Sequence, residues 1–305
     1  MIPDASFIDN VIVRKSTLYE VEKDVNILDT FTDRDMIRIA KNINRAKLQR
    51  LPKLPKCMDD VHDYLDMDKV ISTKRENLVI FNDKSCNVII FSCESNLKFM
   101  CSVETILVDG TFDYCTKFFQ QMFTVIGFKN NKYVPVALSL LKDKKESWYR
   151  TVMSSLKSKC LEINLIFKPQ HIVSDFEKGI LQAARKEFPD TTLIGCRFHL
   201  SQAWWRKIVG LGLTVEYKNK NSEIGKWLNY VFGKTFLPPD EVGSVFLELI
   251  AEQPIDIRVT EFSDYLVDNY IGNDATFPTT LWAALNNDVW RTNNGSEAFN
   301  SKFKT

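Results

Sequence analysis

A short apolar run that ends in a carboxylate sets the strongest limit on the fold of this chain. Residues 106–112 read Ile-Leu-Val-Asp-Gly-Thr-Phe, with Asp109 directly after three branched apolar side chains. Such a run is typical of a strand buried on both faces, where an uncompensated carboxylate costs several kcal/mol. A second run, 171–174, leads to Asp175 in the same way. Ligands bind at such strand ends in open α/β sheets, although a single acid there is more often a turn former or a helix cap.

The order of the predicted elements indicates the α/β class. The sequence predicts a hairpin over 78–91 and a meander of three strands at 105–109, 119–128 and 133–140, with a turn at Asn130-Asn131 and Pro135 at an edge or a bulge. Helices at 147–161, 176–188 and 200–209 then alternate with strands that end at Asp175 and Cys196. This order predicts a mixed five-stranded sheet with flanking helices.

Residues 210–285 carry a helical pattern without a strand. Proline and glycine punctuate the segment, and helical periodicity covers 222–232, 240–252 and 259–270. A last helix is predicted within 291–305, where Phe299 and Phe303 lie four residues apart on one face. The chain therefore reads as an α/β core with an all-helical insertion before its final helix.

A basic helix is predicted near the start of the chain. Between residues 34 and 56 there are eight Lys and Arg residues and one acid, and Arg38, Lys41 and Arg45 share one face at helical spacing. A solvated surface helix is one interpretation. The other is a contact with nucleic-acid phosphates, for which Arg38, Lys41 and Arg45 are the candidate residues.

Composition limits the environment of the protein. The 305 residues are 45% apolar and 26% charged, as in ordinary soluble proteins. Seven cysteines, an odd count without a Cys-x-x-Cys pair, predict free thiols in a reducing compartment. The N-terminus shows no signal peptide, and no run of about 18 apolar residues could cross a membrane.

Four motifs occur in a fixed order along the chain. They are Asp109-Gly-Thr-Phe, Ser174-Asp175-Phe-Glu, Cys196-Arg-Phe-His199 and Arg291-Thr-Asn-Asn-Gly-Ser-Glu297-Ala-Phe-Asn300. Together, over residues 100–305, they resemble the catalytic core of the Mutator-like element (MULE) transposases. The resemblance implies an RNase H-like fold and a DDE triad of Asp109, Asp175 and Glu297.

The triad is an all-oxygen ligand set, which suits Mg²⁺ or Mn²⁺ and makes zinc the less favoured metal. Asp109 would bridge two ions, while Asp175 and Glu297 would each hold one. Such a site supports an in-line phosphoryl displacement, which would nick a transposon end and join its 3′-hydroxyl to target DNA. Glu261 and Asp288 are the alternatives for the third acid.

Other residues receive supporting roles. Cys196 and His199 match the Cys-x2-His element of the family, and we expect them to be structural or DNA-positioning, because a zinc site needs about four ligands and His171 is the only other histidine in the core. Candidate DNA contacts after this pair are Trp204, Trp205 and Arg206. One tryptophan is expected to pack in the core, and the other could stack on an unpaired base. Thr111 and Glu177 are expected to support the acids.

These observations predict a DDE transposase that acts on DNA in the nucleus, as a homo-oligomer assembled on DNA and without a membrane. The runner-up is a domesticated or decayed transposase that binds DNA without catalysis. A third interpretation is another RNase H-like nuclease, such as a resolvase or an exonuclease. The expected parts are an N-terminal region (1–75), the core (76–209), the insertion (210–285) and a final catalytic helix (286–305) that we expect to be truncated.

Overall fold

The computed structural model describes residues 32–50, 55–67, 70–72, 75–111, 117–219 and 221–283. The chain divides into two compact units, unit 1 (Met1–Cys93) and unit 2 (Glu94–Thr305). The break falls after Cys93, whereas the sequence pattern predicts one after residue 75. The helix predicted within 291–305, with Glu297, and the alternative ligand Asp288 lie outside the described residues.

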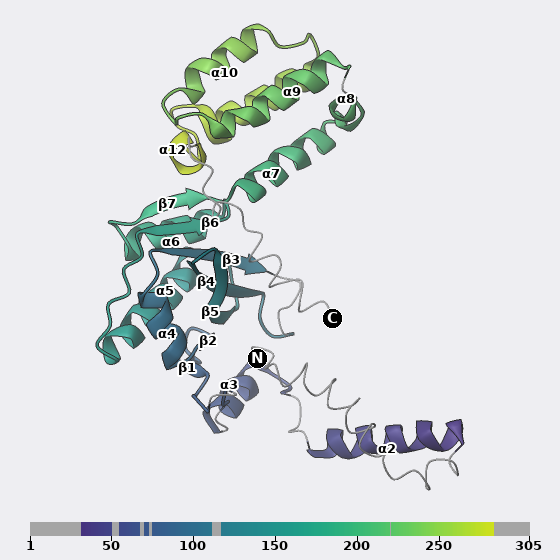
Figure 1. Ribbon diagram of the computed structural model, residues 1–305, viewed down its shortest axis with the longest axis vertical. Coiled ribbons are helices and arrows are strands. Elements are labelled where there is room, and N and C mark those ends of the chain that lie inside the picture. The colour runs from purple at the N-terminus through teal and green to yellow at the C-terminus, as the bar shows by residue number, and fades with distance from the viewer. Residues whose placement is uncertain are drawn as a thin grey trace. The chain divides into compact units, whose positions relative to one another are not determined.

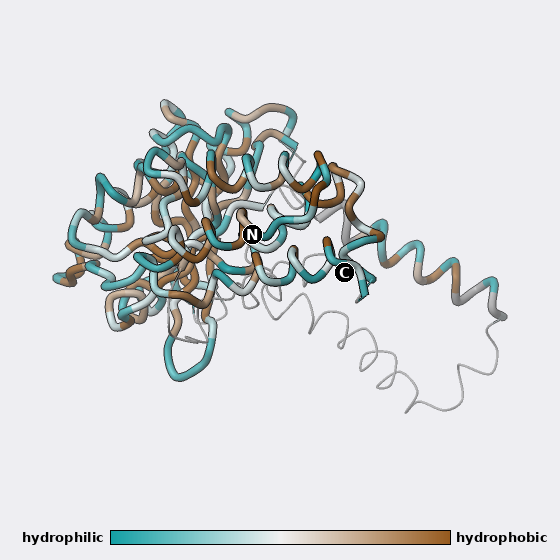
Figure 2. Tube along the Cα trace, turned by 90° about the horizontal axis from the view of Figure 1, so that it is seen from above, coloured by the Kyte–Doolittle hydropathy of each residue, from teal (hydrophilic) through white to brown (hydrophobic). Residues whose placement is uncertain are grey.

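Unit 1 contains the predicted basic helix, the acidic helix that follows it and the predicted hairpin. The elements are α2 (Asp33–Arg50), α3 (Met58–Met67), β1 (Val79–Asp83) and β2 (Val88–Phe91), with β1 and β2 antiparallel. In Figure 2, α2 is the helix at the right, and hydrophobic and hydrophilic residues alternate along it. A buried histidine ties α3 to β1, because Asn82 donates to the His62 carbonyl at 2.9 Å.

Unit 2 is built on five strands that match the predicted meander and parallel pair. They are β3 (Thr105–Thr111), β4 (Gln121–Lys129), β5 (Lys132–Leu141), β6 (His171–Ser174) and β7 (Thr192–Gly195). β4 is antiparallel to β3 and β5, and β6 is parallel to β3 and β7. Within unit 2 the strand order is β5-β4-β3-β6-β7.

Turn and bulge positions follow local residue chemistry. Asn130 and Asn131, between β4 and β5, have φ of 52° and 56°, a left-handed conformation that asparagine tolerates and that two-residue hairpins require. Proline cannot donate to the ladder, and the β4–β5 register shifts beside it, with Val125 opposite Ala137 and Ile126 opposite Pro135. The sequence predicted an edge or a bulge at this proline, and the structure has the bulge.

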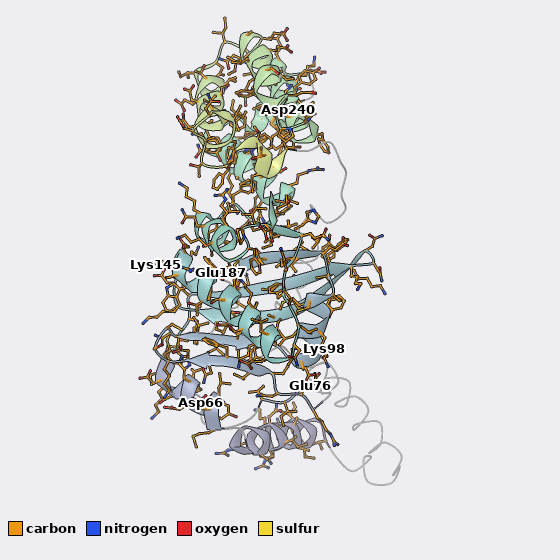
Figure 3. All side chains as sticks on the ribbon, turned by 90° about the vertical axis from the view of Figure 1, so that its left-hand side faces the viewer. Asp66, Glu76, Lys98, Lys145, Glu187 and Asp240 are labelled. Atoms are coloured by element: carbon orange, nitrogen blue, oxygen red, sulfur yellow. The ribbon has the colours of Figure 1, made fainter. Side chains whose placement is uncertain are left out.

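Three helices cover one face of these strands. They are α4 (Glu94–Cys101), α5 (Glu146–Glu162) and α6 (Lys178–Glu187), and Figure 3 shows them in front of the strands, with Lys145 before the start of α5 and Glu187 at the end of α6. The ring of Phe123 on β4 contacts Tyr149 of α5 at 5.1 Å, which places the β3 residue paired with Phe123, Gly110, on the helix-covered face. Because side chains alternate along a strand, Asp109 lies on the opposite face.

The second face carries its own small apolar cluster. Leu107, Val173 and Ile194 from the three parallel strands pack there with Ile126 and Cys196. Leu107 is two residues before Asp109, and Val173 is two residues before Asp175. On each of these strands, the apolar residue that packs in the cluster is therefore followed closely by the acid. Burial of each large apolar side chain stabilises the fold by about 1.5–3 kcal/mol. This packing holds the strands that carry the acids in place.

Beyond β7, the regular elements in the described residues up to 283 are all helices. The elements are α7 (Arg197–Gly210), α8 (Thr214–Lys218), α9 (Glu223–Gly233), η2 (Lys234–Phe236), α10 (Val242–Ala251), α11 (Ile257–Leu266), the π-helix η3 (Val267–Ile271) and α12 (Thr279–Trp282). Figure 1 shows α7 leading from the β7 side of the sheet into this helical cluster. In the described ranges, no helix combines the length and the apolar character that a bilayer crossing requires.

Candidate active site

Two acids lie side by side at one edge of the sheet. β3 and β6 are adjacent and parallel, with Val108 paired to Ser174, and the next residue on each strand is Asp109 or Asp175. Asp109 is buried, with 7% of its surface exposed. The register therefore brings together two carboxylates that are 66 residues apart in the sequence.

The neighbourhood of Asp175 is negatively charged. Burial raises the pKa of Asp175 to about 7, and the charges of Asp109 and Glu177 add to the increase. Two contacts lower the pKa of Asp175 in part. The Glu177 backbone N–H donates to Asp175 Oδ1 at 3.2 Å, and the positive charge of Lys144 acts in the same direction. Two close carboxylates that resist ionising together are stabilised by a bound cation, so this pair fits a site for a divalent metal ion.

A threonine hydroxyl stands across from the first acid. Thr124 of β4 is paired with Asp109, so the two side chains share a face. Thr124 is 1% exposed, and its hydroxyl has no hydrogen-bond partner among the described residues. A buried hydroxyl without a hydrogen-bond partner lowers the stability of the fold. The position of this hydroxyl next to Asp109 makes Thr124 a candidate member of the site.

A hydrogen-bonded chain on the helix-covered face supports the turn that follows Asp175. Gln121 Nε2 of β4 donates to the Tyr149 hydroxyl of α5 at 2.5 Å, and Tyr149 in turn donates to Glu177 Oε1. Gln121 and Tyr149 are completely buried. Burial, followed by the hydrogen bond to Glu177, raises the pKa of Tyr149, which keeps the phenol protonated as a donor.

This chain was not predicted from the sequence, although a signal for part of it exists. Gln121 and Thr124 are polar residues inside the apolar strand 119–128, and polar side chains in a buried strand need partners. Tyr149 gives no comparable signal, because a tyrosine on the apolar face of a helix is ordinary core. Glu177, expected to support the acids, is the residue that links this chain to Asp175, and Thr111 ends β3 two residues after Asp109.

Cys196 and His199 stand where β7 passes into α7. Cys196 is 1% exposed, and its N–H donates to the Ser174 carbonyl at 2.7 Å, beside Asp175. His199 Nδ1 is buried and has no hydrogen-bond partner among the described residues. His171 pairs with Thr192 at the other end of the same strands, four residues or about 13 Å from Cys196. The three residues therefore cannot share one zinc ion.

The two tryptophans have different surroundings. Trp204 is completely buried, and its ring contacts Phe232 at 5.4 Å and Trp282 at 5.7 Å. Trp205 is partly buried against Tyr217 at 5.1 Å, and Arg206 is exposed and donates to Gln202 Oε1. The structure places Trp204 in the helical core, so of the two rings only Trp205 is partly accessible for stacking on a base.

The remaining candidates are exposed on helices. Arg38, Lys41 and Arg45 are exposed on α2 of unit 1, as is Glu261 on α11 of unit 2. Among the described residues no group of three or more His, Cys, Asp and Glu side chains is placed to hold a metal ion.

A surface hollow of 240 Å³ lies elsewhere in unit 2. Its walls include Ile166, Phe167 and Phe188, between the end of α5 and the start of β7. This is the edge of the sheet opposite the acids, because Pro169 and Gln170 lead into the first residue of β6. The hollow is a separate feature from the carboxylate pair.

Comparison with known protein families gives a match over part of unit 2. Residues 105–203 match the MULE transposase domain. The matched region begins with β3 and ends within α7, so it contains Asp109, Asp175, Cys196 and His199. No curated protein matches the chain. The match, over about a third of the chain, supports a relationship to the MULE transposases and implies an interaction with DNA.

Proposed function

We propose that the chain is the catalytic domain of a MULE transposase that cleaves DNA at transposon ends and joins the 3′-hydroxyl to target DNA. The supporting observation is the position of Asp109 and Asp175, next to each other at the ends of adjacent parallel strands inside the region that matches the MULE domain. The proposal includes Mg²⁺ or Mn²⁺ as cofactor, DNA as partner, assembly into a homo-oligomer on DNA, and a nuclear location.

In this proposal Asp109 and Asp175 hold the divalent ions, and Glu297 supplies the third carboxylate. When bound, such ions activate the attacking hydroxyl and stabilise the leaving oxygen of a phosphodiester. The chain itself fixes the geometry: the parallel register aligns the two aspartates, and the Glu177 N–H holds one oxygen of Asp175. Burial of Asp109 in the sheet limits its motion and favours one orientation.

Substitution of the first acid tests the proposal. Asp109→Asn should abolish Mg²⁺-dependent cleavage of labelled duplex ends, because the amide removes a ligand charge. DNA affinity should be unchanged or higher, since one charge that repels phosphate is lost. Asp240→Asn, at an exposed aspartate in the helical cluster, is the matched control and should cleave as the wild type does.

The outcome also separates the two candidate functions. Wild-type protein that binds DNA but never cleaves it with Mg²⁺ or Mn²⁺ would instead indicate a domesticated transposase that only binds. Cleavage that survives Asp109→Asn would remove this aspartate from the mechanism. If Glu297→Gln cleaves normally while Asp109→Asn does not, the third ligand must be another acid.

A further inference from the structure

Five lysines lie at the edge of the sheet that carries the two acids. The topology places them there: β5 ends at Leu141, which pairs with Gln121 at the start of β4, and Met122 pairs with Thr111 at the end of β3. Segments that follow β5 and β6, and the segment before β4, therefore share this edge. The exposed lysines in these segments are Lys117, Lys142, Lys144, Lys145 and Lys178.

The loop after β5 packs against the helix that follows Asp175. A Cβ atom on Gly179, in the first turn of α6, would lie 2.8 Å from the Lys144 carbonyl oxygen, so the two backbones are in contact. The positive charge of Lys144 also acts on Asp175. The lysines of this loop and Lys178, three residues after Asp175, are thus close to the acid pair.

The described acids of this edge other than Asp109 and Asp175 have partners within the protein. Asp143 pairs with Lys145 at 2.8 Å, and Glu146 pairs with Lys186 at 2.6 Å. Glu177 accepts the hydrogen bond from Tyr149. Lys142 and Lys178 form no ion pair in the described part of the chain. Outside these two ion pairs, the described part of this edge has four lysines, Lys117, Lys142, Lys144 and Lys178, and three acids, Asp109, Asp175 and Glu177.

From this arrangement we infer that Lys142, Lys144 and Lys178 bind the phosphate backbone of duplex DNA beside the acid pair; the inference rests on the proposed function. A phosphodiester near Asp109 and Asp175 meets repulsion from two carboxylates, and neighbouring cations offset it. Lysine acts on phosphate as a point charge on a flexible stem. Such contacts release counterions from DNA and carry no sequence preference.

Equilibrium binding without a divalent metal tests the inference separately from catalysis. The full chain is titrated with a random-sequence duplex of about 20 base pairs in EDTA at several salt concentrations. A triple variant, Lys142→Gln, Lys144→Gln and Lys178→Gln, should flatten the slope of log K against log salt by about 0.9 for each phosphate that is no longer neutralised, up to about 2.7. The control variant changes Lys129, Lys132 and Lys168 to Gln. It removes the same charge from the opposite edge and should keep the wild-type slope.

Each result bears on the inference. Equal slopes for the two triple variants would show that only net charge matters and would overturn it, as would equal binding of polyglutamate, which would indicate a general anion surface. Thermal melts of both variants confirm folding. A wild type that binds DNA with the expected slope but never cleaves would contradict the proposed function and leave the binding edge intact.

Discussion

A glycine determines where the residue after Asp175 can lie. A Cβ atom on Gly195, the last residue of β7, would lie 2.5 Å from Phe176 Cζ. The Phe176 ring also contacts Phe277 at 5.2 Å and Tyr270 at 6.0 Å, so it has little room to move. The absence of a side chain at Gly195 therefore sets the position of Phe176 and, through the backbone, of Asp175.

Gly195→Ala should lower the free energy of unfolding by about 1–3 kcal/mol, the usual cost of overpacking a core. It should also reduce metal-dependent cleavage, because a displaced Phe176 moves Asp175. Urea unfolding and the cleavage assay measure the two effects. Gly243→Ala in α10 is the control: apart from its chain neighbours and the backbone of its own helix, no described atom lies within 4 Å of its Cβ position, and alanine there should be neutral or stabilise by up to about 1 kcal/mol. Equal stability of the two variants would contradict this account.

At the scale of residues, the sequence indicates the two acids but not the residues that hold them in position. Asp109 and Asp175 each end an apolar run, a pattern visible in a few consecutive residues. Gly195 and Tyr149 act on residues distant in the sequence, and their partners become known only when β7 and α5 are packed. Local patterns carry no information about such contacts, which is why the hydrogen-bonded chain behind Asp175 was not predicted.

At the scale of elements, Tyr149 joins α5 to β4 and to the turn before α6. Tyr149→Phe removes the hydroxyl that bridges Gln121 and Glu177, which leaves two buried or partly buried polar groups without this partner. The expected loss in the free energy of unfolding is about 1–3 kcal/mol. Because Glu177 also holds Asp175, a higher concentration of Mg²⁺ should be needed for half-maximal cleavage.

Tyr230→Phe is the matched control, since Tyr230 is 64% exposed on α9. It should change neither the unfolding curve nor the Mg²⁺ dependence. A Tyr149→Phe protein that loses stability but keeps the wild-type Mg²⁺ dependence would limit Tyr149 to a structural role. One that keeps both would contradict the hydrogen-bonded chain.

Periodicity explains which elements were predictable. β3, β4 and β5 are mostly apolar, and α5, α9 and α11 repeat apolar residues at helical spacing, so each was expected close to its observed position. The eight-residue α4 was missed because so short a helix shows too few repeats.

In unit 2 the helical insertion shares its core with the α/β part. One cluster of buried residues contains Leu181 of α6 and Leu200 of α7 together with residues from α9 to α12. Phe176, directly after Asp175, packs against the same cluster through Tyr270 and Phe277. The sequence predicts the insertion as a separate part. Continuous packing of this kind instead favours a single cooperative unit.

Hydrogen exchange of the full chain can measure that cooperativity. Phe277→Ala removes a ring at the junction, and a Phe→Ala change in a core costs about 3–5 kcal/mol. If unit 2 is cooperative, the slowest amides of β3 and β6 should lose as much protection as those of α9 and α11. Leu247→Ala, at a side chain that is 68% exposed on α10, should leave both sets unchanged. Loss of protection confined to the helices would show that the insertion unfolds alone, and Phe277 would then have no part in holding the turn that carries Asp175.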